Sequence, residues 1–134
     1  MDEAKFITLD NCLTILIYTD RSKSTNHMEL FTFYGGNYSS YIDYNGKKRN
    51  IKEGSAHLLE HYVCENTVSG DLLDNLRKYN VLSCNAGTSA FNTSYFFNTV
   101  CNFYECLDTF LDGIYNVSFT NEKLNKTKYA VLNE

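Results

Sequence analysis

Short apolar runs separated by turn signals indicate that the first third of the chain is β-structure. Residues 5–9, 12–19 and 28–34 have the length and composition of strands. The second run, CLTILIYT, is almost continuously apolar, which predicts a buried strand. Residues 37–52 are polar, so we expect a long loop there, with a turn at Asn45-Gly46.

Apolar residues at helical spacing dominate the rest of the chain. Four segments are expected to be helices, at residues 55–64, 70–79, 102–114 and 120–134. Their expected N-caps are Ser55, Ser69 or Asp71, Asn102 and Thr120. Residues 94–101 form a clear strand, joined to the mixed stretch 81–92 by a turn near Asn92-Thr93. This order of elements predicts an α+β fold, a mainly antiparallel sheet covered by helices, in one domain over residues 1–134.

Composition and charge exclude several classes of protein. The chain is 43% hydrophobic and 21% charged, as expected of a globular domain with a real core. Its net charge of −4 argues against a nucleic-acid partner, and the short basic run 47–49 is expected to be a solvated loop. No stretch approaches the roughly 18 apolar residues of a membrane span, so no membrane partner is expected. The acidic start, Met-Asp-Glu, does not resemble a signal peptide, so we expect a cytoplasmic protein whose five cysteines are free, mostly buried thiols.

The stretch GSAHLLEH, residues 54–61, carries the candidate chemistry. His57 and His61 are four residues apart, so a helix places both imidazoles on one face, where they can reach the same metal ion. Glu60 lies on the same side and could take a proton from a water bound to that metal. H-x-x-E-H is the inverse of H-E-x-x-H and is typical of inverzincin peptidases. The alternative is a helix with two surface histidines; the third histidine, His27, is expected to be exposed and not to bind a metal.

A catalytic zinc site usually has three protein ligands and an open position, so the third ligand must come from another element. The order of GSAHLLEH, NAGTSAFNTSYFF and a final AVLNE resembles the pitrilysin family of zinc peptidases, which includes insulin-degrading enzyme and the mitochondrial processing peptidase. The resemblance covers residues 9–134. It implies a fold like one domain of such a peptidase, and one Zn²⁺ per chain held by His57, His61 and Glu134, with Glu60 as general base.

The resemblance also assigns roles outside the motif. Asn85 and Ala86 match an edge strand to which an extended peptide substrate is added as a further strand. An ordinary edge strand is the alternative. The family has a supporting glutamate seven residues before its third ligand, and Thr127 stands there in this chain, which predicts weaker support of the metal site. Glu65 and Glu122 are the other acidic candidates near these positions, ranked below Glu134 as ligands.

The implied function is a zinc-dependent endopeptidase or processing peptidase that hydrolyses peptide bonds through a metal-activated water. Family members resemble two or more copies of this domain, so we expect the chain to be the N-terminal catalytic part of a longer peptidase, cut at Glu134. A second half or partner subunit, in a homo- or heterodimer, would then complete the enzyme. Two alternatives remain: a non-catalytic scaffold or substrate-binding subunit of the same family, and a metal-dependent lyase acting on a small molecule.

Overall fold

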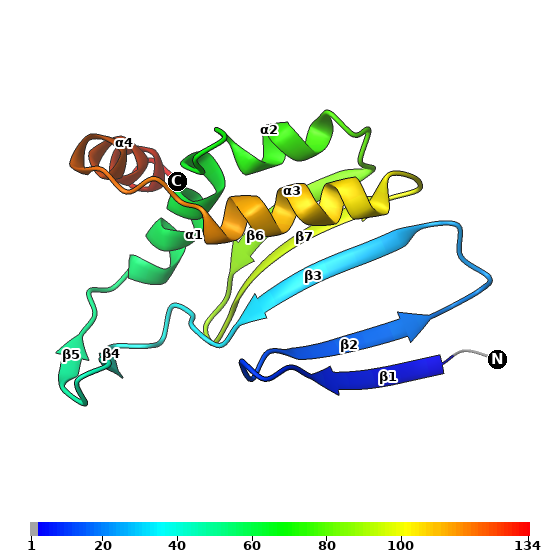
Figure 1. Cartoon of the computed structure of the whole chain (residues 1–134). Coiled ribbons are helices and arrows are strands. Elements are labelled where there is room, and N and C mark those ends of the chain that lie inside the picture. The colour runs from blue at the N-terminus through cyan, green and yellow to red at the C-terminus, as the bar shows by residue number, and fades with distance from the viewer. Residues whose placement is uncertain (1–2) are drawn as a thin grey trace.

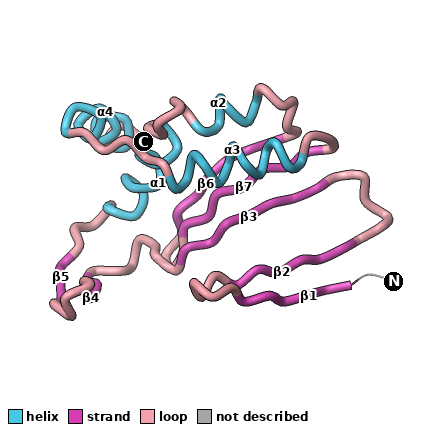
Figure 2. Tube along the Cα trace, in the orientation of Figure 1, coloured by secondary structure: helices cyan, strands magenta, loops and turns pink. Residues whose placement is uncertain are grey.

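A three-stranded antiparallel sheet in the order β3-β7-β6 lies beneath three helices, as the computed structural model of residues 3–134 shows (Figure 1). The strands are β1 (Glu3–Thr8), β2 (Thr14–Thr19), β3 (Asn26–Thr32), β4 (Ser40–Ile42), β5 (Lys48–Asn50), β6 (Ser83–Thr88) and β7 (Thr93–Thr99). The helices are α1 (Ser55–Glu65), α2 (Leu72–Arg77), α3 (Phe103–Tyr115) and α4 (Asn121–Val131). Two further hairpins, β1-β2 and β4-β5, form separate two-stranded sheets (Figure 2). The predicted α+β fold with antiparallel sheets is confirmed.

The core lies between this sheet and α1, α2 and α3. Along β7 the side chains alternate, and Thr93, Tyr95, Phe97 and Thr99 point into the protein. The buried core residues are Cys64, Leu72, Leu76, Tyr95, Phe97, Cys106 and Phe110. Residues from three helices therefore pack on one face of the central strand, which holds α1 firmly over the sheet.

The N-terminal hairpin departs from the prediction of a buried strand at residues 12–19. Cys12 has a positive φ of 68°, which belongs to a turn, so the strand begins only at Thr14. Leu16 and Tyr18 are then 57% and 61% exposed. The reason is that β2 pairs with β1 in a sheet of its own, while the helices pack on β3-β7-β6. The apolar composition predicted a strand correctly, but it does not show whether another element packs on that strand.

The polar segment 37–52, which is expected to be a loop, instead contains the β4-β5 hairpin. The Asp43 carboxylate organises the turn by accepting hydrogen bonds from the backbone N–H groups of Asn45 and Lys47, both at 3.0 Å. Arg49 Nε donates to the other carboxylate oxygen at 2.7 Å. Gly46 adopts the positive φ of 75° that the predicted Asn45-Gly46 turn requires. The basic run is exposed as expected, but its last two residues belong to β5.

Two of the four predicted helix caps make the expected bonds. The Asp71 side chain accepts from the backbone N–H of Asp74 at 2.8 Å, and Thr120 caps α4 in the same way. Asn102 occupies the N-cap of α3 without a side-chain cap bond. Ser55 is not a cap, because it is the first helical residue of α1 and follows Gly54, whose φ is 77°.

The last helix ends earlier than predicted. α4 stops at Val131, and the Asn133 side chain donates a hydrogen bond to the carbonyl of Tyr129 at 2.7 Å. That bond satisfies a carbonyl that a continuing helix would have paired with a backbone N–H. Glu134 therefore lies beyond the helix and not within it.

The cysteines are free, as predicted, but they are not mostly buried. Cys64 and Cys106 are buried, Cys84 is half-buried, and Cys12 and Cys101 are exposed. Within residues 3–134, no helix combines the length and the apolar composition needed to cross a membrane.

Candidate metal centre and peptide cleft

Helix α1 and strand β6 form the two sides of an open cleft of about 550 Å³. The motif predicted a helix, and α1 presents His57, Glu60 and His61 to this cleft from a single face. The opposite side is made by residues 85–90, at the end of β6 and in the turn that follows, together with Gly36. All three residues of the H-x-x-E-H motif thus line the same concave surface as the predicted edge strand.

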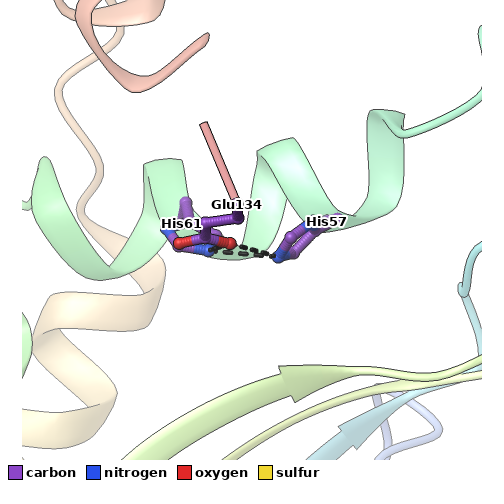
Figure 3. Close-up of side chains that lie close together, drawn as sticks. All are labelled: His57, His61 and Glu134. Carbon is purple, nitrogen blue, oxygen red and sulfur yellow. Dashed lines mark hydrogen bonds and ion pairs between the residues drawn. The ribbon is translucent and has the colours of Figure 1, made fainter. Parts of the chain in front are cut away.

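Three side chains converge over α1, as Figure 3 shows. Nε2 of His57 lies 3.1 Å from Nε2 of His61. Oε2 of Glu134 lies 3.2 Å from the His57 nitrogen and 3.3 Å from the His61 nitrogen. The three atoms form a nearly equilateral triangle. The structure therefore brings together the three residues predicted to bind the metal, although 72 residues separate the second histidine from the glutamate.

This triangle has the dimensions and chemistry of a zinc-binding face. Zinc binds imidazole nitrogen and carboxylate oxygen at about 2.0–2.2 Å in tetrahedral geometry, which puts neighbouring ligand atoms about 3.3 Å apart. The three distances of 3.1, 3.2 and 3.3 Å match that spacing. Two imidazoles and one carboxylate are also a donor set that catalytic zinc sites use, with one coordination position left for water.

Glu134 reaches the histidines because α4 is anchored against α1. The Tyr62 hydroxyl donates to the carbonyl of Ser118 at 3.0 Å and accepts from the backbone N–H of Thr120 at 2.9 Å. Its ring stacks on Phe119, with centroids 4.7 Å apart. These contacts fix the start of α4, and the turn after its end brings Glu134 back towards α1.

Glu60 is buried, and its carboxylate is oriented by a residue that the sequence reasoning missed. The Thr88 hydroxyl, at the end of β6, donates to Oε2 of Glu60 at 2.9 Å. Glu60 is only 7% exposed, so this bond matters for keeping a polar group in place. No signal in the sequence distinguished Thr88 from any other strand threonine. Only the packing of α1 on β6 brings the two together.

Two buried titratable side chains, Cys64 and Tyr95, lie near Glu60. Burial, and then the charge of Glu60, raise the pKa of the Cys64 thiol to about 12. Burial also raises the pKa of the Tyr95 hydroxyl well above its usual value, with smaller effects from Cys64 and Glu60. Both groups therefore stay protonated near pH 7, and neither places a charge beside Glu60.

Strand β6 is the edge of its sheet; among residues 3–134, no strand pairs with its other side. The Ser89 N–H donates to the Asn92 carbonyl at 2.8 Å, so the backbone groups of Ser89 face the neighbouring strand. In an antiparallel sheet, hydrogen-bonded and non-hydrogen-bonded residues alternate, so every second residue back along β6 also faces β7. In the observed register, Asn85 directs its backbone groups to β7 and Ala86 directs them to the open edge. Both predicted residues line the cleft, but only Ala86 offers backbone groups to a new strand.

Of the other residues considered as metal ligands, only Glu65 lies near the two histidines of the motif. Glu65 lies one turn after His61, and its Oε1 is 3.6 Å from Nδ1 of His61. Thr127 is completely buried and donates to Oε2 of Glu65 at 3.0 Å. Glu122 is exposed in the first turn of α4. His27 is exposed, as predicted, and its ring contacts Asn98 and Glu29.

Comparisons with known proteins agree with this geometry. The family model described as Insulinase (Peptidase family M16) matches residues 47–134, which include the motif, the edge strand and Glu134. The chain belongs to this peptidase family. The predicted resemblance to the pitrilysin family is thereby confirmed.

Individual relatives extend the similarity over nearly the whole chain. The uncharacterized zinc protease YmfH of Bacillus subtilis is 27% identical over 122 residues, which cover 90% of this chain and 28% of that protein. A crystal structure described as an M16-like peptidase from Alicyclobacillus acidocaldarius has a TM-score of 0.88 at 22% identity, covering 98% of this chain and 30% of that one. A protease from Helicobacter pylori has a TM-score of 0.79 at 18% identity, covering 99% and 30%. The chain therefore spans less than a third of the length of each of these relatives.

Proposed function

We propose that this chain carries the zinc-binding and catalytic part of a metalloendopeptidase. The observation that carries the proposal is the triangle of His57 Nε2, His61 Nε2 and Glu134 Oε2, with edges of 3.1–3.3 Å, beside an edge strand. Membership of the peptidase family supports the same reaction class. A zinc ion held by these three residues would polarise the scissile carbonyl and lower the pKa of a water towards roughly 7.

Glu60 is the general base in this proposal. It takes one proton from the attacking water, whose oxygen forms a bond to the scissile carbonyl carbon. When the carbon–nitrogen bond breaks, Glu60 returns the proton to the leaving amine, so protons balance over the cycle. Thr88 holds the carboxylate in the direction this transfer needs, because its hydroxyl donates to the Oε2 atom of Glu60.

The substrate would be an extended peptide lying along β6. The backbone N–H and C=O of Ala86 would pair with the peptide as a neighbouring strand does, while the Asn85 side chain would contact it from the sheet face that points away from the helices. Backbone pairing is independent of sequence, so side-chain preferences must come from the rest of the cleft. Since the relatives are more than three times longer, we propose that a second half, from the same chain or a partner subunit, encloses the substrate.

The decisive experiment measures zinc and turnover separately. The chain is stripped with a chelator, reloaded with zinc and assayed by elemental analysis, beside Glu134→Ala and the matched control Glu122→Ala from the exposed surface of α4. About one zinc per wild-type chain and per control, with a sharp loss in Glu134→Ala, is the expected result. Wild-type protein that remains folded and takes up no zinc would overturn the proposal.

Glu60→Gln tests the reaction on the same preparations. The variant should retain zinc and lose at least about 100-fold in peptide hydrolysis, because it keeps the size of the side chain and removes the base. Full zinc loading of the wild type with no hydrolysis, even after the remainder of the peptidase is supplied, would favour the alternative of a scaffold or substrate-binding subunit. Undiminished hydrolysis by Glu60→Gln would rule out the assigned base.

A further inference from the structure

Glu65 lies behind His61, on the side of the ring opposite to the candidate metal site. His61 turns Nε2 towards His57 and Glu134, and its other nitrogen, Nδ1, is 3.6 Å from Oε1 of Glu65. This distance exceeds a hydrogen bond, so the present interaction is electrostatic, and a shift of several tenths of an ångström would complete the bond. Glu65 is thus the one acidic group of α1 that contacts a predicted ligand without being a predicted ligand itself.

A short chain of hydrogen bonds holds Glu65 in this position. The Thr127 hydroxyl donates to Oε2 of Glu65 at 3.0 Å, and it accepts from Nδ2 of Asn66 at 3.3 Å. Asn66 is itself fixed, since the same amide group donates to the carbonyl of Tyr62 at 3.1 Å. Thr127 and Asn66 are both buried, so water does not compete for these hydrogen bonds. The direction of each proton is set: from Asn66 to Thr127, and from Thr127 to Glu65.

We propose that Glu65 is a positioning residue of the metal site, and that Thr127 acts through it. The inference rests on the zinc site of the proposed function. A histidine binds a metal through the lone pair of one nitrogen, and its proton must then reside on the other. The negative charge of Glu65 beside Nδ1 stabilises the tautomer with the proton there, which leaves Nε2 free to bind.

This assignment changes the meaning of the threonine at position 127. The family resemblance leads one to expect a supporting carboxylate at that position. In this chain the carboxylate comes from α1 instead, at the residue four positions after His61, and Thr127 supplies the hydroxyl that orients it. The threonine at position 127 therefore does not mean that the metal site lacks a supporting carboxylate. In this proposal Glu65 supplies the carboxylate and Thr127 orients it.

The test measures zinc affinity by competition with a chromophoric chelator. Glu65→Gln removes the charge and keeps the shape, and we expect it to weaken zinc binding about 10- to 100-fold. Thr127→Val removes the hydroxyl and should weaken binding about three- to tenfold, while Thr127→Ser should restore wild-type affinity. Glu122→Gln is the matched control on the exposed surface of α4 and should leave the affinity unchanged.

A double-mutant cycle separates positioning from a structural effect. If Thr127 acts through Glu65, the double variant Glu65→Gln, Thr127→Val binds zinc no more weakly than Glu65→Gln alone. The cobalt(II) form provides a second readout, because a displaced His61 should alter the visible absorption bands of the metal in Glu65→Gln. Circular dichroism of the metal-free proteins shows whether each variant is folded; Glu65 is partly exposed, so its variant suffices if Thr127→Val does not fold.

Each outcome bears on a different statement. Tight zinc binding by the wild type with an unchanged constant in Glu65→Gln overturns this inference and leaves the proposed function intact. If the losses of zinc affinity add up in the double variant, only the role of Thr127 is overturned, and that of Glu65 stands. A folded wild-type chain that binds no zinc overturns both the proposed function and this inference.

Discussion

The helix-covered half of the molecule and the N-terminal hairpin use similar apolar residues with opposite results. In the first, β6 and β7 lie under α1, α2 and α3, and Phe97 is completely buried against Phe103 and Phe110. In the second, β1 and β2 form a two-stranded sheet with each other, and Phe6 is 71% exposed. The same side chain thus contributes to a core in one place and lies on the surface in the other. The difference is that helices cover the β3-β7-β6 sheet and no helix covers the β1-β2 hairpin in the part of the chain that the structure describes.

The candidate metal site lies on the half that is packed. His57 and His61 belong to a helix held over β6, and Glu134 follows a helix anchored to the same α1 by Tyr62. Ligands for a metal must be held close to their bound geometry before the ion arrives, which requires packed supporting residues. The exposed hairpins could not provide such support. Substitutions in the packed half should therefore have larger effects than matched substitutions in the N-terminal hairpin.

The largest effect is expected for the same change made in both halves. Phe97→Ala removes a completely buried ring and should lower the free energy of unfolding by about 3–5 kcal/mol. Phe6→Ala, in the exposed hairpin, should change it by less than about 0.5 kcal/mol. Urea denaturation of the two variants and the wild type measures both. Equal losses would mean that the hairpin is packed as tightly as the core.

An intermediate effect is expected at the anchor of α4. Tyr62→Phe removes the hydroxyl that bonds to Ser118 and Thr120, and should cost about 1–3 kcal/mol in unfolding free energy. It should also weaken zinc binding, because Glu134 depends on the position of α4. Tyr18→Phe, on the exposed strand β2, is the control and should change neither quantity. Unaltered zinc affinity in Tyr62→Phe would show that α4 is held in place by other contacts.

The smallest effect concerns the buried thiol beneath Glu60. The folded protein raises the pKa of Cys64 from 9.0 to about 12, so between these values the unfolded chain has lost a proton that the folded chain keeps. The contribution is therefore fully present below pH 9 and is lost as the pH rises towards 12. Between pH 8 and pH 10, the unfolding free energy should fall by about 1 kcal/mol more in the wild type than in Cys64→Ala.

The matched control for this measurement is Cys12→Ala, in the turn between β1 and β2. Cys12→Ala keeps the buried Cys64 thiol, so the fall in stability attributed to Cys64 should persist in this variant over the same pH range. Parallel curves for the wild type and Cys64→Ala would contradict the burial of that thiol as the cause. Urea denaturation at the two pH values, on all three proteins, provides the comparison.

Much of the fold and part of the site could be predicted because they depend on local spacing. The period of apolar residues located four helices and most strands to within a few residues, since a helix or strand repeats its own pattern. His57, Glu60 and His61 could be placed on one face of one helix for the same reason. Glu134 was found only through family resemblance, because no local rule connects His61 with a residue that lies 73 positions further along the chain.

The four helices, most of the strands and the residues of the H-x-x-E-H motif could all be read from local patterns in the sequence. Three further features follow only from tertiary packing: Thr88 orients Glu60, Thr127 bonds to Glu65 behind His61, and β2 stays exposed. These facts depend on contacts between elements far apart in the chain, where the packing of α1 on β6 and on α4 sets the distances. Local spacing decides which side chains share one face of a helix. The packing of helices and sheet decides which residues of other elements that face contacts.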